Sequence, residues 1–385
     1  MNVVFGMPNM VIGGVESVFI RTLDGMLKSI SDDPVYKDTK ISVITHAKIT
    51  EPVYVDWFKK HKEIKVYVCY PLQNWFERLK EYTEFFPLRQ LRKLIFGLYK
   101  KFSLLKVKRY FSGIDVFIDY KNCSFFKELR FCDAKKITWV HGSVKYLVDS
   151  GICNRLALYD KIVGLTDDFV IEFKKTFPSL ERKVLRIYNP IDKELIENAA
   201  KGAPKPYGKY FCSVSRLENH QKDLGTLIVA FNKFYLRNKK PDVKLMIVGG
   251  GPQEKKLKKL ADSLGCDKAV VFAGVQNNPF GYMKNAMCVI LSSKLEGLPT
   301  VLIEAMALNT LCVSSDCQYG PKEILLDGEA GILFRTGNAE QLAAIMTDVY
   351  SKRTDTTVMI EKASKSLTRF SPKLITKQIM DLIWA

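Results

Sequence analysis

The sequence contains no long hydrophobic segment. None of its apolar runs approaches the roughly 18 consecutive residues of a membrane-spanning helix, so no such helix is expected. The first residues, MNVVFGMPNM, place no basic residue ahead of an apolar run, which argues against a secretory signal peptide. The nine cysteines include no CxxC pair, and several lie in strand-like runs such as YFCSVS and LCVSSD. This pattern is typical of reduced, buried cysteines in a cytoplasmic protein and argues against a disulfide framework or a zinc site.

The sequence has fewer acidic residues than basic ones. The 385 residues include 59 Lys and Arg against 41 Asp and Glu, a net charge of +18 that is spread over both halves. This excess favours anionic partners, which include nucleic acid, an acidic lipid surface and phosphorylated ligands. No nucleic-acid-binding module is recognisable, which disfavours a nucleic-acid-binding protein.

Short β-branched or aromatic runs alternate with helical stretches along the chain. The runs are nearly continuous in apolar character, as in parallel strands buried on both faces. Alternation of such strands with helices predicts βαβ units and doubly wound sheets, an α/β fold. The predicted strands are residues 2–7, 40–46, 64–70, 114–120, 135–141, 161–166, 183–189, 210–215, 243–250, 269–274, 288–293, 311–316 and 331–335.

This pattern restarts after the polar segment ENAAKGAPKPYGK (197–209), whose proline and glycine residues indicate a linker. We predict an N-terminal Rossmann-like domain over 1–195 and a C-terminal one over 207–369. The last segment, about 370–385, begins with a Ser-Pro helix signal and is expected to pack back on the first domain. Ligands of open α/β sheets bind outside the carboxyl ends of the strands, so the residues that follow strands are candidate site residues.

Two glycine-rich segments follow predicted strands. Gly13 and Gly14 open a helical pattern, where backbone N–H groups and the helix dipole could meet an anion; a plain turn is the alternative. No GxGxxG fingerprint is present there, which weakens a dinucleotide-binding dehydrogenase. The later segment 249–251, before Pro252, is interpreted as a tight turn.

Charged residues also follow strands in the second half. Arg216 and Lys222 could clamp a diphosphate, and a solvated basic pair is the alternative. Glu296 follows the strand at 288–293, and Glu304 lies in the apolar helix that Pro299 opens. A carboxylate in a buried helix needs a partner, which sugar or ribose hydroxyls could supply; a structural salt bridge is the alternative.

Together these motifs resemble glycosyltransferase family 4. The resemblance rests on GGVE (13–16), SRL (215–217) with Lys222, GGGP (249–252), the EG(x)6E segment from Glu296 to Glu304 followed by AMA, YNPID (188–192), FAGVQNNP (272–279) and DCQYGPKEIL (316–325). It implies the GT-B architecture, two Rossmann-like domains facing across a cleft, and a retaining transfer that needs no metal or other cofactor. No Asp-x-Asp metal pair is present. The chain departs from the family pattern in the spacing of Arg216 and Lys222, at Asn309 and at Leu311.

The resemblance implies a role for each motif. Arg216 and Lys222 would bind the diphosphate of a nucleotide-diphosphate sugar, Glu304 its ribose and Glu296 the donor sugar. His141 ends a predicted strand where family members carry a histidine near the reacting sugar; a structural histidine is the alternative. The implied catalytic residues are Glu296, His141, Arg216 and Lys222. The implied donor-binding residues are Gly13, Gly14, Arg216, Lys222, Gly274, Val275, Glu296, Gly297, Leu298, Pro299, Thr300, Val301 and Glu304.

The segment from Phe85 to Gly113 contains no acidic residue. Its cations alternate with large apolar residues, which is typical of a segment that binds an anionic membrane; a solvated helix face is the alternative. The expected membrane contacts are Arg89, Arg92, Lys93, Lys100, Lys101, Lys106, Lys108 and Arg109.

These observations favour a glycosyltransferase at the cytoplasmic face of the membrane. Its expected partners are a nucleotide sugar, UDP-linked rather than GDP-linked, a glycan or glycolipid acceptor in lipopolysaccharide, capsule or lipid-linked oligosaccharide synthesis, and an anionic membrane surface, with no nucleic acid. A sugar-nucleotide epimerase or a phosphorylase on the same architecture is the alternative enzyme.

Overall fold

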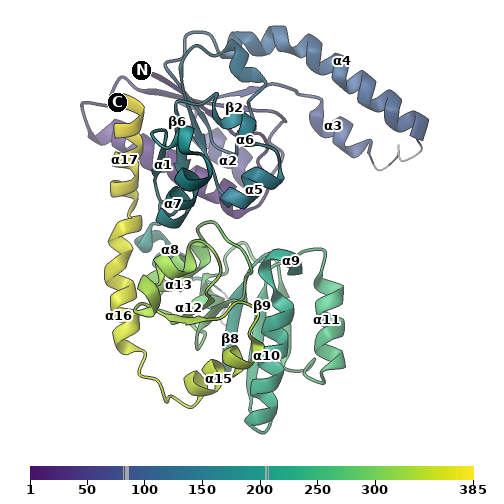
Figure 1. Ribbon diagram of the computed structural model, residues 1–385, viewed down its shortest axis with the longest axis vertical. Coiled ribbons are helices and arrows are strands. Elements are labelled where there is room, and N and C mark those ends of the chain that lie inside the picture. Colours follow the sequence, from purple (N-terminus) through teal and green to yellow (C-terminus); the bar gives the residue numbers. More distant parts are fainter. Residues whose placement is uncertain (81, 83–85, 204–205, 207) are drawn as a thin grey trace. The chain divides into compact units, whose positions relative to one another are not determined.

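The computed structural model describes residues 1–80, 82, 86–203, 206 and 208–385 (Figure 1). The chain divides into two compact units, each with its own sheet. Unit 1 comprises residues 1–165, 169–187 and 376–385, and unit 2 comprises 166–168 and 188–375.

Unit 1 is built on a seven-stranded parallel sheet in the order β3-β2-β1-β4-β5-β6-β7. Its central strand β1 pairs with β2 on one side and with β4 on the other, and Val3 and Phe5 of β1 are fully buried. Burial on both faces explains the continuous apolar runs. The strands are β1 (Asn2–Gly6), β2 (Lys40–Thr45), β3 (Lys65–Val68), β4 (Val116–Asp119), β5 (Lys135–Trp139), β6 (Lys161–Gly164) and β7 (Val184–Arg186).

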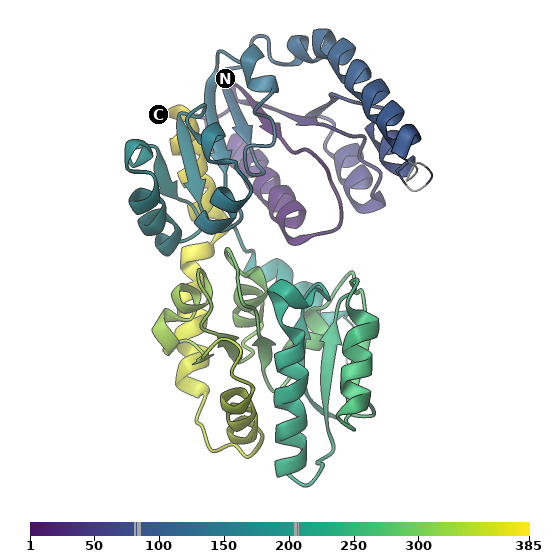
Figure 2. The same cartoon turned by 45° about the vertical axis from the view of Figure 1, so that its right-hand side comes forward.

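Helices cover both faces of this sheet (Figure 2). The helices of this part of the chain are α1 (Gly14–Asp32), α2 (Pro52–Lys60), α3 (Gln73–Arg78), α4 (Phe86–Tyr110), α5 (Val144–Asp149), α6 (Cys153–Leu156), α7 (Asp167–Thr176) and α17 (Pro372–Trp384), with 3₁₀ turns η1 (Glu128–Phe131) and η2 (Pro178–Leu180). Helices α3 and α4 extend outward from the sheet (Figure 1). Residues 376–385, which include most of α17, group with unit 1, where the Trp384 ring lies 6.0 Å from that of Tyr36.

Unit 2 repeats the arrangement with six parallel strands in the order β10-β9-β8-β11-β12-β13. Helix α10 presents Leu224, Leu227, Phe231 and Phe234 at helical spacing to the sheet core, and the Phe234 ring meets Phe211 of β8 at 5.1 Å. The strands are β8 (Lys209–Val214), β9 (Val243–Val248), β10 (Val270–Gly274), β11 (Val289–Leu291), β12 (Cys312–Ser315) and β13 (Ile332–Phe334). The helices are α8 (Lys193–Lys201), α9 (Asn219–Lys222), α10 (Leu224–Arg237), α11 (Glu254–Ser263), α12 (Phe280–Lys284), α13 (Thr300–Ala307), α14 (Pro321–Ile324), α15 (Ala339–Tyr350) and α16 (Thr357–Ser366), with 3₁₀ turns η3 (Leu326–Gly328) and η4 (Leu367–Phe370).

Every predicted strand run contains a strand, and the predicted α/β class is confirmed. The expected linker at 197–209 is wrong in its first part, because α8 extends to Lys201 and buries Ile196 and Ala200 in unit 2. Among the described helices, none combines the length and apolar character needed to cross a bilayer.

Candidate functional site

The loops that follow β8, β11 and β12 meet at the carboxyl edge of the unit 2 sheet. This is expected because parallel strands all end at one edge. The amide of Lys294, after β11, donates to the carbonyl of Gln221, after β8, over 2.7 Å. Leu295 forms a β-bridge with Gln318, after β12. These contacts assemble one site from segments far apart in the sequence.

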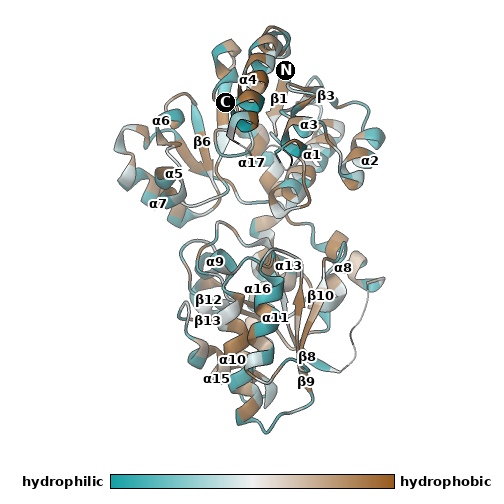
Figure 3. Cartoon of the chain, turned by 90° about the vertical axis from the view of Figure 1, so that its right-hand side faces the viewer, coloured by the Kyte–Doolittle hydropathy of each residue, from teal (hydrophilic) through white to brown (hydrophobic). Residues whose placement is uncertain are grey.

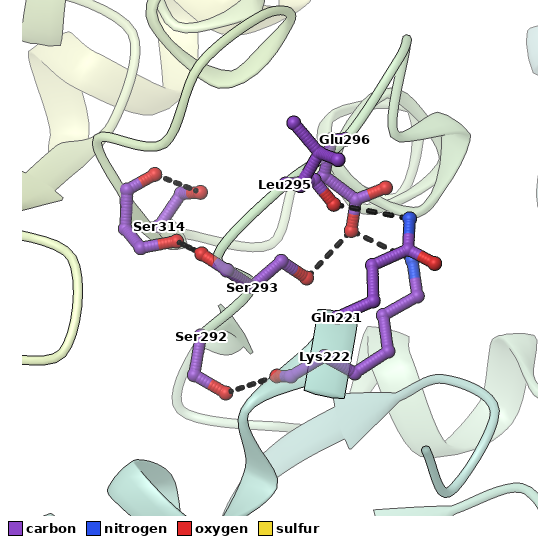
Figure 4. Close-up of polar contacts among 8 residues, drawn as sticks. Gln221, Lys222, Ser292, Ser293, Leu295, Glu296 and Ser314 are labelled. Carbon is purple, nitrogen blue, oxygen red and sulfur yellow. Dashed lines mark hydrogen bonds and ion pairs between the residues drawn. The ribbon is translucent and has the colours of Figure 1, made fainter. Parts of the chain in front are cut away.

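Lys222 and Glu296 form an ion pair at the centre of this site (Figure 4). The Lys222 Nζ donates to Glu296 Oε1 over 2.7 Å, and their side chains are 18% and 7% exposed. Ser293 Oγ donates to the same carboxylate oxygen over 2.5 Å. Ser292 Oγ donates to the Lys222 carbonyl over 3.0 Å, which fixes the lysine backbone. Two predicted site residues are therefore held in contact before any ligand binds.

Buried Cys317 is next to this pair. Burial and the charge of Glu296 raise the pKa of the Cys317 thiol to about 12. The thiol therefore stays protonated at neutral pH and adds no negative charge to the site.

Three glycines bring the loop after β9 against the loop after β8. A Cβ on Gly249, whose φ is +137°, would lie 1.9 Å from the Ser215 carbonyl oxygen, and one on Gly251 would lie 2.6 Å from the Leu217 carbonyl oxygen. The Leu217 amide donates to the Gly250 carbonyl over 2.9 Å. The predicted tight turn is thus also a backbone-to-backbone contact, and only glycine permits it.

Three other predicted site residues of unit 2, Arg216, Gly274 and Val275, lie in or next to the loops after β8, β9 and β10. Arg216 is exposed and, among the residues described, forms no hydrogen bond or ion pair with Lys222 or Glu296. Gly274 has a φ of +69° and accepts from the Gly249 amide over 2.8 Å. Val275 is 65% exposed, and its Cγ2 would lie 2.7 Å from a Cβ on Gly250.

Helix α13 begins beside Glu296. Pro299 is its N-cap, one residue earlier than the predicted first turn, and the helix starts at Thr300. Its predicted burial is confirmed, but Glu304 is only half-buried. The amides of the first turn, at Thr300 and Val301, are ones that a helix cannot pair internally. Gly297 and Leu298 connect Glu296 to this helix, and a Cβ on Gly320 would lie 2.6 Å from the Gly297 carbonyl oxygen.

In unit 1, the predicted glycine pair opens α1. Gly13 is the N-cap, and a Cβ there would lie 2.7 Å from Glu16 Oε2, whereas Gly14 has open space. Glu16, which is 3% exposed, accepts from Lys121 Nζ over 2.7 Å. The glycine turn is thereby tied to the loop that follows β4.

His141 is held by that same loop. Its Nε2 lies 2.9 Å from the Tyr120 carbonyl oxygen, and its backbone amide donates to Asn122 Oδ1 over 2.9 Å. Burial, and secondarily the charge of Lys121, lower the pKa of His141 to about 4, although the backbone hydrogen bond opposes this shift. The imidazole is therefore neutral at pH 7.

Several residues around the predicted ones were not selected from the sequence: Ser292, Ser293, Cys317, Asp119, Tyr120, Lys121 and Asn122. Ser293 and Asp119 are polar residues at the ends of predicted strands, and this is a signal that could have identified them. Asp119 is fully buried and accepts from Tyr159 Oη and the Phe125 amide, each over 2.7 Å, so it shapes the loop that holds His141.

Helix α4 contains the segment predicted to contact a membrane, and it mixes hydrophobic and hydrophilic residues along its length (Figure 3). Two of the predicted contacts face the protein: Arg92 Nη1 donates to the Phe76 carbonyl over 3.3 Å, and Lys100 Nζ lies 4.8 Å from the Tyr70 ring centroid. The other predicted cations are exposed: Arg89, Lys93, Lys101, Lys106, Lys108 and Arg109.

Large apolar side chains are also exposed along α4. Apart from the adjacent pair Leu94 and Ile95, they recur every three or four residues, so they share one face of the helix. Their exposed fractions range from 47% at Ile95 to 77% at Leu105. They are Leu88, Leu91, Leu94, Ile95, Leu98, Phe102 and Leu105.

Two Rossmann-like units of parallel strands define the GT-B fold of glycosyltransferases. The solved structure of Anabaena HepE with UDP and glucose matches with a TM-score of 0.76 and 18% identity, over 100% of this chain and 99% of that one. Residues 196–366 match the family described as "Glycosyl transferases group 1".

Curated relatives that match this chain are also named as glycosyltransferases. An uncharacterized glycosyltransferase of Methanocaldococcus jannaschii is 40% identical over 115 residues, 30% of this chain and 28% of the relative. The N-acetylgalactosamine-N,N'-diacetylbacillosaminyl-diphospho-undecaprenol 4-alpha-N-acetylgalactosaminyltransferase of Campylobacter jejuni is 31% identical over 212 residues, 55% of this chain and 56% of the relative. The chain therefore spans about half or less of the length of these two relatives.

Proposed function

We propose that this protein is a retaining, metal-independent glycosyltransferase that moves a sugar from a nucleotide-diphosphate sugar, UDP-linked, to a glycan acceptor in lipid-linked oligosaccharide, lipopolysaccharide or capsule synthesis. UDP in the Anabaena structure and the diphospho-undecaprenol acceptor in the name of the Campylobacter relative support this proposal. The family match over residues 196–366 supports transfer over the alternative epimerase or phosphorylase.

The observation that carries the proposal is the Lys222–Glu296 pair. Glu296 keeps the ammonium of Lys222 in place in the free protein, over 2.7 Å. A Lys ammonium has three N–H donors, so Lys222 can also meet a diphosphate oxygen. Negative charge grows on that diphosphate as the sugar leaves, and a cation positioned in advance stabilises it. Glu296 then remains as an acceptor for hydroxyl groups of the transferred sugar.

The other predicted donor-binding residues complete this assignment. Arg216, exposed at the same edge, is free to bind the second phosphate. The first-turn amides of α13 supply further donors to an anion. Glu304 meets the ribose, and Gly274 and Val275 meet the base.

Thermal unfolding with sugar nucleotides tests the donor assignment. A ligand at 100 times its Kd stabilises the folded state by about 2.7 kcal/mol. UDP and UDP-sugars should raise the Tm in the presence of EDTA, and GDP-sugars should raise it less. A donor effect that requires added magnesium or manganese, or one confined to GDP-sugars, would contradict the proposal.

We propose further that α4 attaches the enzyme peripherally to an anionic membrane. Its exposed apolar face can enter the headgroup region, and the exposed cations beside it can pair with acidic lipid. Phe102 and Leu105 are 76% and 77% exposed, which is costly in water and favourable at a lipid surface. Arg92 and Lys100 hold α4 to the protein instead of contacting lipid. This attachment would bring the enzyme to a lipid-linked acceptor.

A further inference from the structure

Two residues of the loop after β4, Tyr120 and Asn122, form hydrogen bonds with His141. The Tyr120 carbonyl lies 2.9 Å from His141 Nε2, and the Asn122 side chain accepts from the His141 amide. Between them, Lys121 reaches to Glu16 of α1 over 2.7 Å. The sequence resemblance assigns no role to Tyr120, Lys121 or Asn122.

This loop has an unusual backbone that its own hydrogen bonds maintain. Asn122 and Cys123 both adopt positive φ, at 51° and 56°. Such a conformation costs free energy in residues other than glycine and persists where the surroundings impose it. Here Asp119 imposes it, by accepting from the Lys121 and Phe125 amides and from Ser124 Oγ. The loop is therefore a rigid support.

The Tyr120 carbonyl decides which ring nitrogen carries the proton. A carbonyl oxygen can only accept a hydrogen bond, so His141 Nε2 must donate. In the neutral ring, Nδ1 is then a hydrogen-bond acceptor. Within the described residues, Nδ1 has no hydrogen-bond partner, so it is available to a ligand.

Charge around the ring opposes a second proton. Lys121 is the charged group that acts on the imidazole, and Glu16 holds its ammonium in place. The Tyr120 ring lies 5.1 Å from the imidazole, and the Tyr120 hydroxyl is hydrogen-bonded to Thr22. Burial raises the pKa of Tyr120, so that hydroxyl stays neutral.

We infer that Lys121 and Asn122 are positioning residues that, with the Tyr120 carbonyl, present His141 as a neutral imidazole whose Nδ1 accepts a hydrogen bond from a substrate hydroxyl. The ring thus binds a hydroxyl group that donates to Nδ1. Because the ring carries no positive charge, it is unsuited to pairing with a phosphate. The identity of the ligand, a sugar, rests on the proposed function. The protonation state of the His141 ring does not depend on that function.

Nitrogen NMR of the full chain labelled with ¹⁵N-histidine tests the state of the ring without any substrate. The chain has four histidines, and a His141→Gln variant assigns the signal. His141 should show the neutral Nε2–H form from pH 5.5 to 8.5. An Nδ1–H ring, or a ring that is a cation at pH 7, would overturn the inference even if the protein proves to be a glycosyltransferase.

Variants of Lys121 test the positioning role. Lys121→Gln should raise the pH at which His141 takes up a proton, and Lys121→Arg should keep it low. In transfer assays, Lys121→Gln should move the acid limb of the kcat profile to higher pH and leave the donor KM within about twofold. The matched control is Lys127→Gln, an exposed lysine of the same segment. An unchanged His141 titration in Lys121→Gln would overturn the role of Lys121. Failure of every variant and the wild type to transfer sugar, with the expected NMR result, would contradict only the proposed function.

Discussion

Lys222 and Glu296 lie 74 positions apart in the chain and are joined by a 2.7 Å ion pair in which neither side chain is more than one-fifth exposed. Arg216, the other predicted diphosphate ligand, is exposed. The two cations therefore differ in what they do for the free protein. Lys222 compensates a buried carboxylate, and Arg216 does not.

This difference predicts separate effects on stability. Lys222→Met leaves the Glu296 carboxylate without its counter-ion and should lower the free energy of unfolding by roughly 3–5 kcal/mol, as for other broken buried pairs. Arg216→Ala should change it by less than about 0.5 kcal/mol, as is usual for exposed sites. Both should weaken UDP binding. Urea unfolding and calorimetry measure the two quantities, with the double variant Lys222→Met/Glu296→Gln to isolate the pair. Equal loss of stability in Lys222→Met and Arg216→Ala would contradict this assignment.

The glycines after β9 predict a second difference in stability. Gly249→Ala places a Cβ against the Ser215 carbonyl at a φ of +137°, so it should cost more than about 2 kcal/mol. Gly202→Ala is the matched control, because nothing lies within 4 Å of its added Cβ. Chemical unfolding of both variants provides the comparison. If Gly249→Ala proves as stable as Gly202→Ala, the two loops are not in close contact.

The fold was predictable from the sequence because burial on both faces makes each parallel strand a continuous apolar run. The segments of the site were predictable for the same reason, since they follow those strands. Contacts such as Lys222 with Glu296 or Lys121 with Glu16 depend on which strands are neighbours, and no local pattern encodes that order. The basic segment at α4 was visible, but charge alone could not show that Arg92 and Lys100 face the protein.

His141 predicts a pH dependence of stability. Its pKa is about 4 in the folded protein, below the ordinary value of 6.5, so the unfolded chain takes up the proton first as the pH falls. The contribution of the neutral ring is therefore complete above pH 6.5 and is lost between pH 6.5 and 4. It should amount to roughly 1–3 kcal/mol.

Urea unfolding of the wild type and of His141→Gln at pH 7.5 and at pH 5 checks this effect. The wild-type advantage should shrink at pH 5, and comparison with the variant cancels the titration of other groups. A difference that stays the same at both pH values would show that His141 is not held neutral by the fold.

Helix α4 predicts two separable components of membrane binding. Neutralising Lys101, Lys106 and Lys108 should reduce flotation with anionic liposomes by more than tenfold at low salt, since each contributes about 1 kcal/mol near such a surface. Replacing Leu98, Phe102 and Leu105 by Gln should also reduce it, through loss of apolar burial. Only the charge variant should lose the salt dependence.

The control for membrane binding is Leu195→Gln/Leu236→Gln, two exposed leucines of unit 2 that are 56% and 54% exposed. This variant should float as the wild type does. Flotation that neither α4 variant alters would exclude α4 as the membrane contact.

The two glutamates around α13 should differ in ligand binding. Glu296 contacts Lys222 in the loop before the helix, where it would meet the transferred sugar, whereas Glu304 lies within the helix and would meet the ribose. Glu→Gln keeps the size of each side chain but removes the charge that strengthens its hydrogen bonds. Glu296→Gln should lower kcat about 10²–10³-fold. It should leave UDP affinity within about threefold, because an amide oxygen can still accept a hydrogen bond from Lys222 and UDP carries no sugar to meet this side chain. Glu304→Gln should weaken UDP itself by about tenfold, the effect of one charged hydrogen bond. Calorimetry with UDP decides between them, and the reverse order of affinities would place the ribose at Glu296 and not at Glu304.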